Sequence, residues 1–305
     1  MSEVLLHGVI PSIATPLTQA GEVDERSLRS LVQYLLRAGV HGFLANGTMG
    51  GFAFLNNDDQ IRAISIVTNE VGGAVPIIGT IAETSTRRAL RQLAEVQKCG
   101  VSCVAFLTPF YFAANQAHLI SFYTEVTAAT DLPVLLYDNP LLTKTRIKPE
   151  TAAVLKTNLP QIIGIKESDH DYSHLQKLLD LTRDGRSFSV FTGTESLMLA
   201  GLEAGCSGSI AGLHNICPQL AVALYKAYCH GDLEAARNLQ HDLDEVCHVF
   251  QYGDVWGGFE EALRYLGLAD RVVGAPYDSK LTAAEAKQIH TIVDQFLRPS
   301  VELGK

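Results

Sequence analysis

The chain has 305 residues, of which 47% are hydrophobic and 19% are charged, so it carries ample apolar material for a large buried core. Its formal net charge of −9 gives it no electrostatic reason to bind nucleic acid or an anionic membrane surface. No apolar run approaches the ~20 residues that a helix needs to span a bilayer, so we expect no membrane insertion.

The N-terminus and the cysteines favour a cytoplasmic protein. Met1-Ser2-Glu3 begins with an acid and leads into a strand-like run, which is not the pattern of a secretory signal. No two cysteines have the C-x2-C spacing of a metal site, and we expect all six to be reduced and without a metal. They are Cys99, Cys103, Cys206, Cys217, Cys229 and Cys247.

Short apolar runs alternate with longer amphipathic segments along most of the chain. Most of these runs are nearly continuous in apolar residues, which is typical of parallel strands buried on both faces. The expected strands are Val9–Ala14, Gly42–Ala45, Val75–Gly79, Cys103–Leu107, Val134–Tyr137, Ile162–Lys166, Ser187–Phe191 and Ser207–Ile210.

The segments between these strands read as helices. Asp24–Arg37 carries leucines and a valine at helical spacing, and Ser85–Lys98 and Gln116–Ala129 behave similarly. Several expected helices end just before a glycine, the usual residue at that position. These glycines are Gly39, Gly100 and Gly205.

Eight strands, each followed by a helix, predict an α/β fold of the (β/α)8 TIM-barrel type over residues 1–230. A doubly wound open sheet is the competing fold, but the first strand ends in Ala14-Thr15-Pro16-Leu17 without a Gly-rich phosphate loop. Residues 231–305 are expected to form a C-terminal helical extension packed on the barrel. The last expected helix of the barrel is Pro218–His230. The expected helices of the extension are Leu233–Phe250, Gly258–Leu266 and Ala283–Leu297.

The strongest candidate for chemistry is Lys166, which closes an apolar strand where barrel enzymes place their reactive groups. Partial desolvation there lowers the pKa of a lysine, and a neutral amine attacks a ketone to form an imine. Other lysines, such as Lys156, lie in contexts expected to keep the ammonium in water. The alternative is that Lys166 only pairs with Glu167 at a strand end.

Two further strand ends offer weaker candidates, in Tyr137 and Gly47–Gly51. Tyr137 could supply a phenol for proton transfer, although a tyrosine there is more often a packed ring with a wet hydroxyl. The turn Gly47–Gly51 offers backbone amides and the Thr48 hydroxyl to a carboxylate, or it is an ordinary glycine-rich turn. Tyr111, after the fourth strand, offers a second hydroxyl or a subunit contact.

Together these segments resemble the dihydrodipicolinate synthase and N-acetylneuraminate lyase family of Schiff-base lyases over nearly the whole chain. The most specific element is Gly164–Ser168 preceded by Tyr137–Pro140, beside the family pattern G-x-K-[DE] preceded by Y-N-x-P. The resemblance implies that Lys166 forms the Schiff base and that Tyr137 is its acid–base partner.

The resemblance also implies a carboxylate-binding turn at Gly47–Gly51, with Thr48, Met49 and Gly50 at the substrate. Tyr111 falls where family members often hand a tyrosine across a dimer interface. The family is typically a homotetramer, a dimer of dimers, and needs no metal or organic cofactor, so we expect the same here.

Departures from the family pattern narrow the expected reaction. Met49 stands where a hydroxyl residue is usual, and its thioether cannot relay a proton. Gly51 replaces the usual Glu. Leu142, expected to be buried, stands near an arginine of the synthase and cannot make a charge-assisted bond. These departures argue against dihydrodipicolinate synthase, and the stretch Leu141-Leu142-Thr143 is more similar to the branch that acts on 2-oxo-3-deoxy sugar acids.

Later strand ends are expected to bind the distal part of the substrate, since the family uses these loops for that purpose. The candidates are Thr194 and Glu195 after the seventh strand and Ile210 after the eighth, with His214 and Asn215 as weaker ones. An acid such as Glu195 is equally expected at the start of a helix, where the helix dipole favours it.

The leading hypothesis is therefore an aldolase that releases pyruvate and an aldehyde from a 2-oxo acid. A dehydratase or deaminase starts from the same imine and stays open. A non-catalytic 2-oxo acid binding protein is the third hypothesis, motivated by Met49 and Gly51.

Overall fold

Eight parallel strands form the centre of the described part of the chain, which in this computed structural model covers residues 6–278 and 280–297. Residues 1–5, at the start of the expected barrel segment, and residues 298–305, at the end of the expected C-terminal extension, lie outside the described part. The strands are β1 Gly8–Pro11, β2 Phe43–Ala45, β3 Ile77–Ile81, β4 Cys103–Leu107, β5 Val134–Asp138, β6 Ile162–Glu167, β7 Ser189–Thr192 and β8 Gly208–Ala211.

The strands close into a barrel. Their order is β1-β8-β7-β6-β5-β4-β3-β2, and a parallel bridge between Ser12 and Leu44 joins the two ends of this series. The amide of Ile13 also donates to the carbonyl oxygen of Leu44 at 3.0 Å. The fold expected from the sequence, a (β/α)8 barrel, is therefore confirmed.

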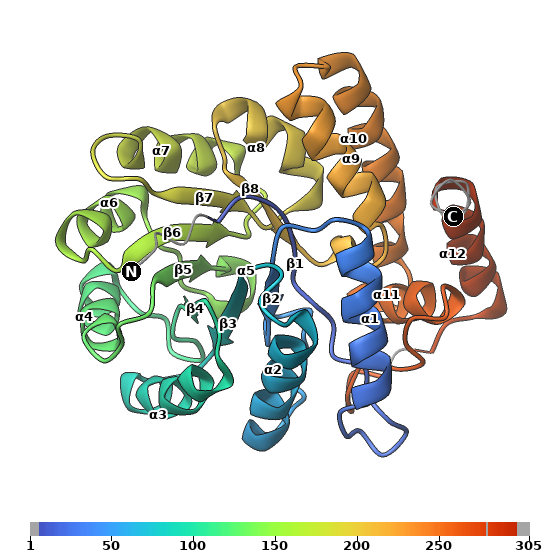
Figure 1. Cartoon of the computed structure of the whole chain (residues 1–305), viewed down its shortest axis with the longest axis horizontal. Coiled ribbons are helices and arrows are strands. Elements are labelled where there is room, and N and C mark those ends of the chain that lie inside the picture. The colour runs from blue at the N-terminus through green and yellow to red at the C-terminus, as the bar shows by residue number, and fades with distance from the viewer. Residues whose placement is uncertain (1–5, 279, 298–305) are drawn as a thin grey trace.

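Helices surround the strands, and the last three lie to one side of the ring (Figure 1). The helix bounds are α1 Glu25–Arg37, α2 Asn57–Val71, α3 Thr86–Val96, α4 Gln116–Thr127, α5 Pro140–Thr143, α6 Pro149–Asn158, α7 Tyr172–Thr182, α8 Met198–Ala204, α9 Pro218–Cys229, α10 Leu233–Cys247, α11 Asp254–Tyr265 and α12 Ala283–Phe296, with single 3-10 turns η1 Gln97–Cys99, η2 Glu195–Leu197, η3 Leu213–Asn215 and η4 His248–Gln251. Among the described residues, none of these helices is long and apolar enough to cross a membrane.

Local sequence explains where several helices begin and end. The Asp24 side chain accepts a hydrogen bond from the Ser27 amide at 3.2 Å and so caps α1. Gly39, Gly100 and Gly205 have φ values of +81°, +77° and +112°, which L side chains rarely adopt. The glycines therefore stop the helices where the sequence predicted.

Alternation along the strands divides the buried side chains into two cores. On β5, Val134 and Leu136 pack outward against the helices, whereas Leu135 and Tyr137 face the barrel interior. The interior stays apolar until the C-terminal ends of the strands, where polar side chains appear. This geometry places the candidate residues at one mouth of the barrel.

Candidate active site

Lys166 and Tyr137 are paired neighbours on β6 and β5 and lie side by side at the barrel mouth. Their exposed fractions are 3% and 1%. The Nζ atom of Lys166 lies 4.2 Å from the centroid of the Tyr137 ring. The two residues that the sequence singled out most strongly are thus in contact and shielded from bulk water.

Tyr137 has a pKa that is lower than the ordinary value of a phenol. Burial alone raises the pKa, but the positive charge of Lys166 and hydrogen bonds from Thr48, Lys166 and Asn139 outweigh it. The Thr48 hydroxyl lies 3.0 Å from the phenol oxygen. These neighbours favour the phenolate, which is the form that accepts a proton.

Both residues open into a cavity of about 360 Å³ at the C-terminal end of the barrel. The size suits a small organic acid more than a macromolecule. Its wall contains Ser12, Thr48, Met49, Tyr137, Asn139, Leu141, Leu142, Lys166, Ser168, His170, Gly193, Thr194, Glu195, Ala211, Gly212, Phe250 and Val255.

The Gly47–Gly51 turn reaches the cavity through Thr48 and Met49. A Cβ atom on Gly47 would lie 2.4 Å from Leu44 Cδ2, so a side chain at this position would displace that of Leu44. A Cβ atom on Gly212 would lie 2.5 Å from Met49 Cγ. The small residue after β8 therefore makes the space that the Met49 thioether fills.

Thr194 and Glu195 also line the cavity, although each already has a partner. The Thr194 hydroxyl donates to the carbonyl oxygen of Asp169 at 3.0 Å. Glu195 starts η2, and its carboxylate accepts the amide of Leu213 at 2.9 Å. Glu195 therefore ties the β7 and β8 loops together as well as facing the cavity.

Gly50 and Ile210 lie behind the cavity wall and not on it. A Cβ atom on Gly50 would lie 3.0 Å from the Gly47 nitrogen, so this residue is packed inside the turn. Ile210 is fully buried in the barrel interior. The weaker candidates His214 and Asn215 are fully buried too, and Asn215 holds Ala14 and Ser12 by hydrogen bonds of 3.0 and 2.8 Å.

Tyr111 lies outside this cavity. It is 86% exposed, has a positive φ of 79°, and stacks edge-on against Phe112, which is 81% exposed. Both rings therefore point to solvent, and Tyr111 does not line the cavity of its own chain.

Two expectations about burial were wrong. Leu142 is 62% exposed, because α5 is a single helical turn that carries it to the rim of the cavity. Lys156 is buried, and its ammonium donates to the carbonyl oxygens of Thr182 and Asp184 at 2.6 and 2.5 Å. Lys156 is far from free, since two carbonyls hold it.

The sequence reasoning missed several residues of the cavity wall. Ser12, Asn139, Ser168 and His170 all follow the end of a strand, so their position was a usable signal. Among the described residues, the buried hydroxyls of Ser12 and Ser168 have no hydrogen-bond partner.

Two other wall residues, Phe250 and Val255, come from η4 and α11. Nothing in their local sequence indicated a place at the mouth of the barrel, because they reach it only through tertiary packing.

A buried amine beside a buried phenol, at the C-terminal mouth of a (β/α)8 barrel, is the arrangement of a class I lyase, whose chemistry begins with a lysine imine. Comparison with known proteins agrees. The chain belongs to the dihydrodipicolinate synthetase family, whose model matches residues 5–296.

Named relatives and solved structures share most of their length with this chain. A 4-hydroxy-tetrahydrodipicolinate synthase of Methanopyrus kandleri is 35% identical over 78% of this chain and 79% of its own. An uncharacterized DapA-like lyase of Halobacterium salinarum is 32% identical over 86% and 85%.

Among solved structures, YagE, a prophage protein of the dihydrodipicolinic acid synthase family from E. coli K12 in complex with pyruvate, is 26% identical, with a TM-score of 0.90 over 96% of this chain and 99% of that one. The dihydrodipicolinate synthase of Thermotoga maritima is 27% identical, with a TM-score of 0.91 over 95% and 98%. The chain is thus a lyase of this family.

Proposed function

We propose that this lyase is an aldolase that cleaves a 2-oxo-3-deoxy sugar acid into pyruvate and an aldehyde, with Lys166 and Tyr137 as its catalytic residues. The observation that carries the proposal is the contact between the Lys166 ammonium and the Tyr137 ring, 4.2 Å from its centroid, at the wall of a small cavity.

In this mechanism the Tyr137 phenolate takes one proton from the Lys166 ammonium, and the free amine attacks C2 of the substrate. Tyr137 returns that proton to the C2 hydroxyl, which leaves as water and gives a protonated imine. The Tyr137 phenolate then takes the proton of the C4 hydroxyl. The C3–C4 bond breaks, its electrons pass to the imine to give an enamine, and C4 leaves as an aldehyde. Protonation at C3 and hydrolysis of the imine release pyruvate and restore the lysine.

The substrate carboxylate rests on the Gly47–Gly51 turn, near the Thr48 hydroxyl. Thr48 has a second role, since its contact of 3.0 Å holds the Tyr137 phenol in place. Pyruvate in the related YagE structure supports a 2-oxo acid as the ligand class.

The distal wall supports a polyhydroxylated substrate. Ser168, His170 and Thr194 line it, and the Ser168 hydroxyl lacks a partner among the described residues. Leu142, at the rim, cannot bind a second carboxylate as an arginine would. Some relatives carry the synthase name, yet this feature argues against that reaction here.

Product analysis tests the proposed reaction. The purified protein is incubated with a panel of 3-deoxy-2-oxo sugar acids, and products are identified by mass spectrometry. Pyruvate plus an aldehyde supports the aldolase. A single 2-oxo product that keeps the full carbon chain identifies a dehydratase or deaminase instead. Imine formation without turnover of any acid identifies a binding protein, the outcome that Met49 and Gly51 motivate.

We also propose a homotetramer built as a dimer of dimers, located in the cytoplasm. The exposed rings of Tyr111 and Phe112 support a subunit contact. All six cysteines are free, which fits a reducing compartment.

A further inference from the structure

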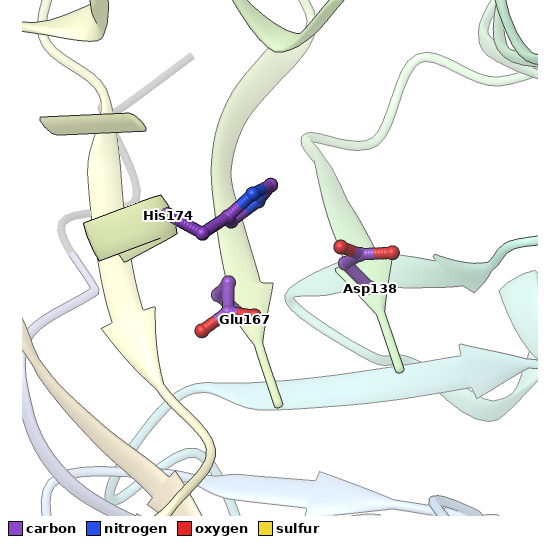
Figure 2. A group of neighbouring side chains, drawn as sticks. All are labelled: Asp138, Glu167 and His174. Atoms are coloured by element: carbon purple, nitrogen blue, oxygen red, sulfur yellow. The ribbon is translucent and has the colours of Figure 1, made fainter. Parts of the chain in front are cut away.

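Asp138 and Glu167 follow Tyr137 and Lys166 directly on β5 and β6, and they pair with each other across the two strands. Because side chains alternate along a strand, these two carboxylates point out of the barrel toward the helix layer. Both are fully buried. Figure 2 shows them on neighbouring strands with His174, from α7, beside them.

The three side chains form one buried group. One oxygen of each carboxylate and one ring nitrogen of His174 lie within 4.8 Å of one another. Among the described residues, Asp138 Oδ2, Glu167 Oε2 and His174 Nε2 have no hydrogen-bond partner. The remaining carboxylate oxygens are held by the amides of Ile147 at 3.0 Å and Asp169 at 2.9 Å.

Two buried carboxylates without a cation partner cannot both stay charged without a large free-energy penalty, because burial removes the water that would stabilise their charges. The cation that acts on both carboxylates is Arg146, whose side chain is 38% exposed and already pairs with Asp169 and Asp171. The other titratable groups that act on the three are Tyr123 of α4, Glu150 of α6, Lys177 of α7 and Cys206 before β8.

The pKa directions agree with this penalty. Burial, and then the charge of Glu167, raise the pKa of Asp138 to about 8, against the Ile147 amide and Arg146. Burial and then the charge of Asp171 raise the pKa of Glu167 to about 8, against Arg146. Burial and Arg146 lower the pKa of His174, which keeps the imidazole neutral.

We propose that Asp138 and Glu167 hold at least one proton between them at neutral pH, in a buried hydrogen-bonded group closed by neutral His174, and that this group positions Tyr137 and Lys166. The shared hydrogen bond joins the strand ends of β5 and β6 on the outer face, directly behind the amine and the phenol. Its loss would leave two like charges side by side and drive those strand ends apart. The inference that this group positions Tyr137 and Lys166 rests on the proposed function. The inference that the two carboxyl groups share a proton is independent of it.

Infrared difference spectroscopy tests the shared proton. The spectrum of the double variant Asp138→Asn/Glu167→Gln is subtracted from that of the wild-type protein at pH 7. We expect the carbonyl stretch of a protonated carboxylic acid in the wild type, lost as the pH rises through about 8. Each single variant should keep a carbonyl band, because burial still raises the pKa of the remaining carboxyl group. Absence of the band from the wild type at pH 7 would overturn the proposal.

A divalent cation is the rival occupant, since two carboxylates and a neutral imidazole are also suitable ligands. Elemental analysis of the purified protein separates the two. One equivalent of a divalent metal in the wild type, lost in Asp138→Asn, would overturn the shared proton. Less than a tenth of an equivalent, roughly, supports it.

The positioning role is tested by the rate at which borohydride traps pyruvate on the protein. With a pKa of about 8, the protonated fraction of Asp138 falls about tenfold between pH 7 and pH 9. We therefore expect the wild-type trapping rate to fall about tenfold more over this range than the rate of Asp138→Asn. The amide of Asp138→Asn donates at every pH and should keep the rate. Asp138→Ala has no donor and should be slow throughout.

The same pH dependence in wild type and Asp138→Asn, or a wild-type rate in Asp138→Ala, would overturn the positioning role. If the wild type traps no pyruvate at any pH, the proposed function fails, whereas the infrared result still decides whether the proton is shared.

Discussion

In the proposed mechanism, Tyr137 works because its neighbours reverse the effect of burial on its pKa. The Lys166 charge and the Thr48 hydroxyl both stabilise the phenolate. A phenol buried without them would hold its proton too tightly to act as a base near neutral pH. The acid–base property therefore belongs to the group of three side chains.

Tyr137→Phe keeps the ring and removes the hydroxyl. We expect the turnover rate to fall by about 10²–10⁴-fold, the usual contribution of a positioned acid–base group, with the fold unchanged. Steady-state kinetics and circular dichroism measure the two effects. A loss of less than about threefold would show that another group carries the proton.

Thr48→Val removes the hydrogen bond of 3.0 Å to the Tyr137 oxygen. Loss of a donor to the phenolate raises the pKa of Tyr137, so the acidic limb of the kcat/KM profile should move to higher pH, by about one unit. Thr127→Val is the matched control, because the Thr127 hydroxyl is buried on α4 without a partner among the described residues. An unmoved limb in Thr48→Val would contradict the role of this contact.

At the scale of elements, β6 depends on Gly164 to carry Lys166 to the mouth of the barrel. A Cβ atom at this position would lie 2.2 Å from the carbonyl oxygen of Ser189 on β7. Backbone cannot yield as a flexible side chain does. The glycine is therefore required for β6 and β7 to pair.

Gly164→Ala should lower the free energy of unfolding by about 3 kcal/mol or more, as overpacking against backbone does, and should slow pyruvate trapping on Lys166. Gly201→Ala in α8 is the control, since the nearest atom to its Cβ would be Cys206 Sγ, a side-chain atom at 3.3 Å. Its gain in helix propensity offsets this contact to within about 1 kcal/mol. Urea titrations measure both, and equal stabilities would contradict the argument.

Sequence patterns predicted the elements well because burial on both faces leaves a local signal. All eight expected strands are confirmed, and β4 has the predicted bounds, Cys103–Leu107. The start of α11 was missed by four residues: the expected helix began at Gly258, whereas the structure begins it at Asp254. Asp254 has a positive φ of 54°, which no periodicity of apolar residues reveals.

Side-chain placement between distant elements was less predictable. Lys166, Tyr137 and Thr48 could be placed at the mouth because each lies at or just after the C-terminal end of a strand. Packing between segments far apart in sequence decides the other placements. It buries Lys156, leaves Leu142 exposed and brings Phe250 into the cavity wall. The local sequence around a residue does not indicate such contacts.

At the scale of the whole molecule, the exposed rings of Tyr111 and Phe112 link the site to assembly. If Tyr111 serves the cavity of a neighbouring subunit, Tyr111→Ala and Lys166→Ala should each be inactive alone. Mixed subunits should regain activity, because a Tyr111→Ala subunit keeps its own Lys166 and receives Tyr111 from its partner.

Activity of the refolded mixture and sedimentation of each variant test this prediction. A mixture as inactive as its two components, with the oligomer intact, would place Tyr111 outside the chemistry. A monomeric wild-type protein would contradict the assembly itself.

The central claim, that Lys166 forms an imine with a 2-oxo acid, is tested most directly by mass spectrometry after incubation with pyruvate and borohydride. Lys156→Ala serves as the control, because Lys156 is the other buried lysine among the described residues. We predict one reduced pyruvate adduct on Lys166, absent in Lys166→Ala and retained in Lys156→Ala. No adduct, or an adduct on another lysine, would contradict the account.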